Sequence, residues 1–142
     1  MGFEPTIVCF ACEYCAYTAA DMAGALRLAY PANVKTIRVP CSGKVDVLHI
    51  LRSLQKGADG VLVAGCIMGD CHFIKGNLRA TKRVEYAQQM LEEIGVGGDR
   101  VKMIYVSAGQ GAVFAKEASV FTEKIKKLGP NPIKEGADKA AA

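Results

Sequence analysis

Residues 60–64 read Gly60-Val61-Leu62-Val63-Ala64, a short apolar run without a polar break. Residues 7–10, Ile7-Val8-Cys9-Phe10, form a second run of the same kind. Strands with one face in water alternate apolar and polar residues, whereas strands covered on both faces are apolar throughout. The two runs therefore predict two central strands of a sheet with helices on both faces.

Two further strands and four helices complete the pattern. The predicted strands cover residues 6–10, 36–39, 60–64 and 101–106, and a helical pattern follows each of them. Four such repeats indicate a parallel sheet, because right-handed crossovers place each helix on a face of the sheet. Residues 36–39 alternate polar and apolar side chains, as a strand at the edge of a sheet does. The sequence therefore predicts an α/β fold with a single doubly wound domain, flavodoxin-like or Rossmann-like, and a four-stranded parallel sheet in the order 2-1-3-4.

Apolar residues recur at helical spacing in each predicted helix. These residues are Met22, Leu26, Ala29 and Tyr30; Val47, Leu48, Leu51 and Leu54; Val84, Ala87, Leu91 and Ile94; and Phe114, Ala118, Phe121, Ile125 and Leu128. Gly129 and Pro130 end the last helix. We expect a folded domain over residues 1–130 and a disordered tail over residues 131–142.

The composition excludes several classes of protein. The chain has 142 residues, 51% of them apolar and 23% charged, which suits one domain with a single core. No apolar run reaches the roughly 18 residues of a membrane-spanning helix, and no leader precedes the first strand, so we expect a cytoplasmic protein that does not enter a membrane. A net charge of +4 without Trp gives no basic, aromatic surface for nucleic acid.

Six cysteines lie in the first half of the chain: Cys9, Cys12, Cys15, Cys41, Cys66 and Cys71. Without an export signal, such a count indicates metal or redox chemistry rather than disulfides. Cys12 and Cys15 follow the first predicted strand. Cys41 follows the second, and Cys66 and Cys71 follow the third. Because the carboxyl ends of adjacent parallel strands meet at one edge of the sheet, we expect these five thiols to converge in one crevice.

The spacing of the five thiols suits an iron–sulfur cluster or a structural zinc ion. Cys12 and Cys15 form a C-x2-C pair, and Cys66 and Cys71 form a C-x4-C pair. Either centre requires four thiolates, so four of the five are expected to bind. Cys9 lies inside the first strand, where a thiol packs as a small apolar side chain.

Other residues near the predicted crevice have supporting roles. Gly43, Gly65 and Gly69 are expected to let the backbone approach the centre closely. His72 is either a polar neighbour of the centre or a loop residue, and His49 is expected to be a surface or packing residue.

A basic stretch follows the last cysteine. Lys75, Arg79, Lys82 and Arg83 occur without an acidic residue between them. They form either a solvated helix face or a docking surface for an acidic partner.

Three other functions use the same cysteines. A zinc-stabilised interaction module would gain folding free energy from the metal. A dithiol oxidoreductase would use Cys12 and Cys15, but that function leaves the other three thiols unexplained. A c-type haem would need export, for which the chain shows no signal.

Several blocks of the sequence resemble the delta subunit of methyl-viologen-reducing hydrogenase. The blocks are Phe10-Ala11-Cys12-Glu13-Tyr14-Cys15-Ala16-Tyr17, Ala20-Asp21-Met22-Ala23-Gly24, Arg38-Val39-Pro40-Cys41-Ser42-Gly43, Gly57-Ala58-Asp59-Gly60-Val61-Leu62-Val63-Ala64-Gly65-Cys66, Gly69-Asp70-Cys71-His72, Lys75-Gly76-Asn77 and Ser107-Ala108. The resemblance covers residues 7–130, and Cys9 is an addition to the family pattern.

The resemblance implies an electron-transfer subunit of an oxidoreductase complex, with a 2Fe-2S cluster and no substrate site of its own. Its implied partners are the hydrogenase small and large subunits, or a formate dehydrogenase, and the flavin-containing subunit of heterodisulfide reductase. In that complex of methanogenic archaea, the flavin bifurcates the electrons. Our hypothesis is that Cys41, Cys66 and Cys71, with one or both of Cys12 and Cys15, hold the cluster.

Overall fold

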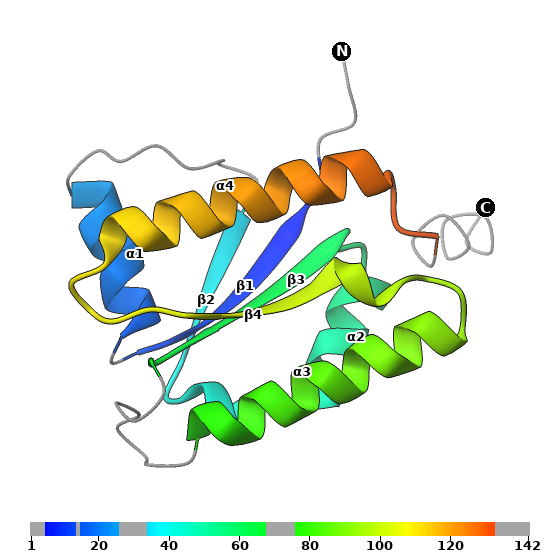
Figure 1. Cartoon of the computed structure of the whole chain (residues 1–142), viewed down its shortest axis with the longest axis horizontal. Coiled ribbons are helices and arrows are strands. Elements are labelled where there is room, and N and C mark those ends of the chain that lie inside the picture. Colours follow the sequence, from blue (N-terminus) through cyan, green and yellow to red (C-terminus); the bar gives the residue numbers. More distant parts are fainter. Residues whose placement is uncertain (1–4, 14, 26–33, 68–75, 133–142) are drawn as a thin grey trace.

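A computed structural model describes residues 5–13, 15–25, 34–67 and 76–132. Strands and helices alternate along the chain, as the sequence predicts (Figure 1). The strands are β1 (Ile7–Cys12), β2 (Val34–Val39), β3 (Gly60–Gly65) and β4 (Val101–Tyr105), and the helices are α1 (Ala16–Ala25), α2 (Val47–Gln55), α3 (Gly76–Glu93) and α4 (Gly111–Leu128). Two short 3-10 helices, η1 (Ser42–Lys44) and η2 (Gly98–Arg100), follow β2 and precede β4.

All four strands pair in parallel in the order β2-β1-β3-β4, which confirms the predicted topology. β1 continues two residues beyond its predicted end, because Ala11 and Cys12 stay paired with Arg38 and Val39 of β2. Cys12 is therefore the last residue of a strand, whereas the sequence pattern had indicated the loop that follows.

Helices cover both faces of the sheet: α1 and α4 lie on one face, and α2 and α3 on the other (Figure 1). Neighbouring side chains of β3 alternate between the two cores. Leu62 and Ala64 pack with α1 and α4, whereas Val61 and Val63 pack with α2 and α3. All four are fully buried, which is the physical reason for the unbroken apolar run.

The apolar stripes of the two long helices are largely confirmed. Phe114, Ala118, Phe121 and Ile125 of α4 are fully buried, and Val84, Ala87 and Leu91 of α3 face the opposite core. In the first helix, Met22 is half-buried, and the other three predicted residues lie outside the described part of the chain. No helix of the described ranges is long and apolar enough to cross a membrane.

Three predicted core residues are exposed instead: Leu48, Ile94 and Leu128 are 50%, 65% and 43% exposed. Ile94 follows the last residue of α3, and Leu128 is the last residue of α4, so both lie past the turns that pack on the sheet. In α2 the buried residues are Ile50 and Leu54. Two positions along a helix correspond to a rotation of about 200°, which places Leu48 on the opposite side from Ile50.

A buried polar network closes the amino-terminal edge of the sheet. The Asn131 side chain donates to the carbonyl oxygens of Leu54 and Ala58, both at 2.9 Å, and its backbone N–H donates to the Asp59 carboxylate at 3.1 Å. The Arg100 guanidinium donates to the carbonyl oxygen of Asp59 at 3.0 Å. Asn131 is fully buried, so this first residue of the expected tail packs against the fold. Residues 133–142 lie outside the described part.

Candidate metal centre

Three cysteines converge at the carboxyl ends of the two central strands. Cys12 ends β1, Cys15 directly precedes α1, and Cys66 directly follows β3. The Sγ atom of Cys66 lies 2.8 Å from that of Cys15 and 3.8 Å from that of Cys12. All three Sγ atoms lie within 4.8 Å of one another. The structure thus brings together three of the five cysteines that were predicted to lie at this edge.

The separations suit ligands of a shared metal centre. Two thiolates that bind a tetrahedral metal at about 2.3 Å lie about 3.8 Å apart, which is the separation between Cys12 and Cys66. The Sγ atoms of Cys15 and Cys66 are closer than this, but their 2.8 Å separation exceeds the length of a disulfide bond, about 2.05 Å, so no disulfide joins the two residues. A tetrahedral centre at this place would need one further ligand.

The three thiols of this group are buried, and the environment of Cys15 shifts its pKa. Cys12, Cys15 and Cys66 are 1%, 5% and 3% exposed. Hydrogen bonding with Cys12, and then burial, raise the pKa of the Cys15 thiol well above its ordinary value. A bound cation would displace the protons, because metals bind the thiolate. Thiol–disulfide exchange needs the opposite, an accessible thiol with a lowered pKa. The site therefore favours ligation over the dithiol function.

Asn77 fixes the backbone at Cys66 and at Ile67, the residue that follows it. Its side-chain amide donates to the carbonyl oxygens of Cys66 at 2.9 Å and Ile67 at 3.3 Å, and the residue is 1% exposed. Because Asn77 is the second residue of α3, it ties the end of β3 to that helix. This role was not predicted from the sequence. The available signal was an asparagine in the first turn of a helix that follows a cysteine-rich loop.

Cys41 lies at the same edge of the sheet but outside the group of three. It caps η1, where its Sγ accepts a hydrogen bond from the backbone N–H of Gly43 at 3.4 Å. A Cβ at Gly43 would lie 2.8 Å from the Cα of Gly76, so this glycine lets η1 rest on α3. A Cβ at Gly65 would lie 2.7 Å from the Oγ of Ser42. Both glycines therefore lie at close contacts, and the atom nearest to the added Cβ belongs to α3 for Gly43 and to η1 for Gly65.

The remaining predicted residues divide into two groups. Cys71, Gly69, His72 and Lys75 lie outside the described residues. Cys9 is fully buried in β1, where burial raises its pKa to about 12, and it packs in the core as predicted. The Nδ1 atom of His49 accepts the backbone N–H of Asp46 at 3.0 Å and thereby completes the N-terminal cap of α2. This capping role was not predicted from the sequence.

Comparison with known proteins identifies relatives over nearly the whole chain. A family model described as methyl-viologen-reducing hydrogenase, delta subunit, matches residues 7–129. The vhu iron–sulfur subunit of the F420-non-reducing hydrogenase of Methanocaldococcus jannaschii is 46% identical over 131 residues, which are 92% of this chain and 98% of that protein. The corresponding subunit of Archaeoglobus profundus is 48% identical over 128 residues, 90% of this chain and 93% of the relative.

A further relative is a much longer protein. It belongs to the ferredoxin- and F420H2-dependent CoB-CoM heterodisulfide reductase of Methanosarcina acetivorans, and it is 40% identical over 126 residues. These residues are 89% of this chain but 16% of that polypeptide. A domain similar to this chain is therefore part of a heterodisulfide reductase polypeptide in that organism.

Proposed function

Because the chain belongs to the family of the methyl-viologen-reducing hydrogenase delta subunit, we propose that it is an electron-transfer subunit with a 2Fe-2S cluster. The observation that carries the proposal is the group of three buried thiols at the ends of β1 and β3. The name of the M. jannaschii relative, an iron–sulfur subunit, supports iron and sulfide at this place.

The proposed ligands are four of the five cysteines at this edge. The hypothesis from the sequence includes both Cys41 and Cys71. Because Cys12, Cys15 and Cys66 form one group in the structure, we propose instead that these three supply thiolates and that either Cys41 or Cys71 supplies the fourth. A bound cluster would supply one-electron redox chemistry. The protein would hold the thiolates, exclude water and, through Asn77, fix the backbone at Cys66.

We propose that electrons enter from a hydrogenase or a formate dehydrogenase and leave to the flavin-containing subunit of heterodisulfide reductase. The hydrogenase subunits named among the relatives support the donor. The similar domain within a heterodisulfide reductase polypeptide supports the acceptor, because fusion holds two exchanging proteins together. The flavin of the accepting subunit would then bifurcate the electrons. We place this role in methanogenesis and in the cytoplasm.

Metal analysis of the anaerobically purified protein tests the proposal. We expect about two irons and two acid-labile sulfides per chain, a visible absorption band, and an electron paramagnetic resonance signal after dithionite reduction. Zinc without sulfide would favour the interaction module and overturn the proposal. A protein without metal but with a reversible disulfide would favour the dithiol function.

Single substitutions then assign the ligands. Cys66→Ser should lower the iron content and change the spectrum, because Cys66 contacts both other thiols of the group. Cys9→Ala is the matched control, since this cysteine packs in the core, and it should leave iron, sulfide and spectrum unchanged. Cys41→Ser and Cys71→Ser, measured side by side, identify the fourth ligand. Full cluster occupancy in Cys66→Ser would disprove the assignment.

A further inference from the structure

A pocket of about 450 Å³ lies between η1 and the first half of α3. Cys41 forms part of its wall, so the pocket lies at the edge of the sheet that holds the proposed cluster. Lys44, Arg79 and Arg83 give the pocket three positive charges. One carboxylate, Asp46, also lines the pocket, and it accepts the backbone N–H of Val47 at the start of α2.

The three cations have different roles in the pocket. The Arg83 guanidinium donates to the carbonyl oxygens of Gly43 and Val45, which fixes its position against η1. Lys44 and Arg79 are exposed, and neither forms an ion pair with the residues that the structure describes. Two charges are thus available to a ligand, beside a third that is held in place.

The charges along α3 run against the helix dipole. The first half, residues 76–84, contains Arg79, Lys82 and Arg83 and no acidic residue. The second half, residues 85–93, contains Glu85, Glu92 and Glu93 and no basic residue. A helix is stabilised by acidic residues near its N-terminus and basic residues near its C-terminus, which is the reverse of this order. Helix stability therefore does not explain where these charges lie.

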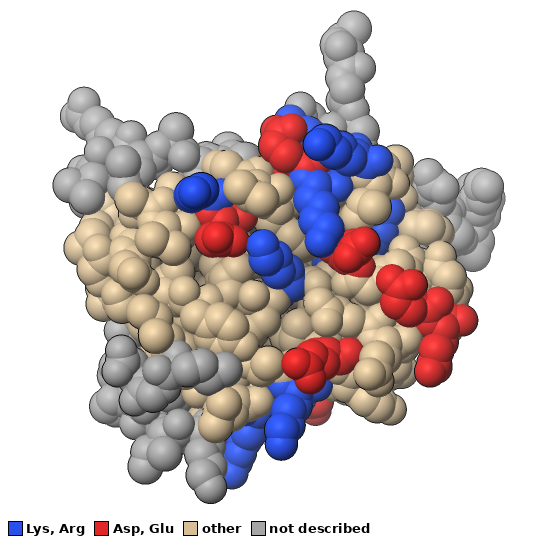
Figure 2. All heavy atoms as spheres, viewed as in Figure 1, with Lys and Arg blue, Asp and Glu red and all other residues tan. Residues whose placement is uncertain are grey.

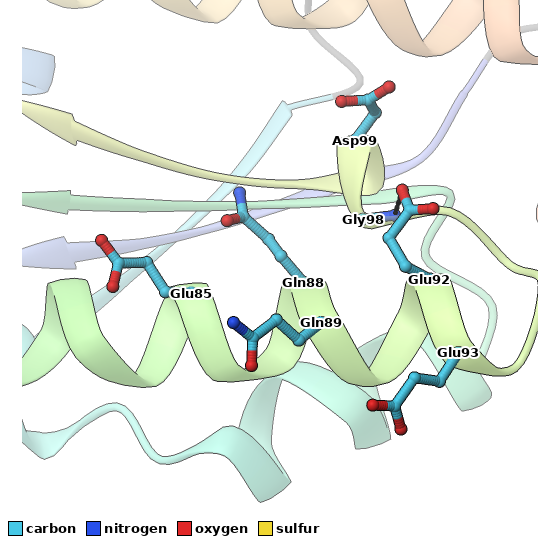
Figure 3. A pocket seen from close by; sticks show the side chains of 7 residues that line it. All are labelled: Glu85, Gln88, Gln89, Glu92, Glu93, Gly98 and Asp99. Atoms are coloured by element: carbon cyan, nitrogen blue, oxygen red, sulfur yellow. Dashed lines mark hydrogen bonds between the residues drawn. The ribbon is translucent and has the colours of Figure 1, made fainter.

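The two halves of α3 form separate charged surfaces. Figure 2 shows Lys and Arg side chains gathered over the first half and Asp and Glu side chains over the second. The second half lines a groove with η2, through Glu85, Gln88, Gln89, Glu92, Glu93, Gly98 and Asp99 (Figure 3). An acidic partner would be attracted to the end of α3 near Cys41 and repelled by the other end.

We propose that the pocket between η1 and α3 receives a carboxylate-bearing segment of the protein that exchanges electrons with the cluster. The inference rests on the proposed function and adds the place and chemistry of docking. Charge complementarity would bring the partner to the edge of the sheet at which Cys41 lies. Repulsion from the acidic half of α3 would fix the orientation of the bound partner.

Paired charge reversals test the docking site. The test variant is Lys44→Glu with Arg79→Glu, and the control is Lys116→Glu with Lys127→Glu on α4, which changes the net charge equally. Cluster-loaded protein is titrated separately with the purified flavin-containing subunit of heterodisulfide reductase and with the purified hydrogenase subunits, at low and high salt. The test variant should bind one of these partners at least about tenfold more weakly, with a shallower salt dependence. The control should bind within about twofold of the unmodified protein.

Three results would overturn the inference: both partners bind the test variant as tightly as the unmodified protein, both variants weaken binding equally, or the unmodified protein binds neither partner. Iron, sulfide and the visible spectrum are measured on the same samples. An unmodified protein that lacks iron and sulfide contradicts the proposed function itself. A normal cluster with unaltered binding of the test variant contradicts only the docking site.

Discussion

Position along one strand separates two cysteines with different chemistry. Cys9 and Cys12 both belong to β1 and are almost completely buried. Cys9 lies in the middle of the strand among apolar side chains of α1 and α4, whereas Cys12 lies at the strand end beside two other thiols. A thiol among hydrocarbon groups stays neutral, and a thiol among thiols can share a cation.

The neutral state of Cys9 predicts a pH dependence of stability. Its pKa is about 12 in the folded protein against an ordinary value of 9.0. Between these values the unfolded state has lost the proton that the folded state keeps, so the free energy of unfolding falls as the pH rises. The Cys9 contribution is fully present below the ordinary pKa of 9.0 and declines above it by up to about 1.4 kcal/mol per pH unit.

Denaturant unfolding of the unmodified protein and of Cys9→Ala at about pH 8.5, 9.5 and 10.5 measures this contribution. The difference between the two proteins should change by about 1 kcal/mol per pH unit above about pH 9.5, with the unmodified protein losing stability faster. Parallel curves over the whole range would show that Cys9 ionises equally in both states.

At the scale of elements, the contact between η1 and α3 positions Cys41. Gly43 meets Gly76 with no space for a Cβ, and Arg83 of α3 holds the carbonyl oxygens of η1 and of Val45 beside it. Gly43→Ala should therefore push η1 from α3 and lower the free energy of unfolding by about 1–3 kcal/mol. Urea unfolding, followed by circular dichroism, checks this prediction.

Gly24→Ala is the matched control for Gly43→Ala. A Cβ at Gly24 meets nothing within 4 Å, and the residue lies inside α1. Alanine is the better helix former, so this variant should gain about 0.5–1 kcal/mol. A shift of both variants in the same direction would disprove the steric role of Gly43.

The strands and their order could be predicted because burial on both faces leaves a local signature. An apolar run such as residues 60–64 can be recognised in the sequence without knowing which strands lie beside it. The ends of the strands were harder to predict. β1 includes Cys12 because its partner β2 continues to Val39, and no feature of residues 11–12 shows that pairing. The group of three thiols likewise depends on packing between residues 51 and 54 positions apart.

At the scale of the whole molecule, Asn131 fastens the chain after α4 to the start of β3. It is hydrogen-bonded to Asp59, Ala58 and Leu54, which lie 72, 73 and 77 positions earlier. A polar residue after Gly129 and Pro130 resembles the start of a tail, and only its distant partners show that it packs against the fold.

Asn131→Ala should lower the free energy of unfolding by about 2–4 kcal/mol, because the buried carbonyl oxygens of Leu54 and Ala58 would lose a donor. Ending the chain after Pro132 is the comparison, and it should change stability by less than about 1 kcal/mol. Thermal unfolding of both variants with bound cluster measures the two losses of stability. A negligible loss in Asn131→Ala would contradict the stabilising role of Asn131.

The meeting of Cys15 and Cys66 has a consequence for the entropy of the unfolded chain. A centre bound by both thiols would close a loop of 51 residues that contains α1, β2, η1, α2 and β3. By the loop-closure relation for covalent cross-links, such a restraint removes conformational freedom worth about 4 kcal/mol from the denatured ensemble, as long as the metal stays bound. The bound metal would then act as a reversible cross-link across the first half of the fold. The length of the closed loop follows from the pairing of β1 with β3 at the centre of the sheet.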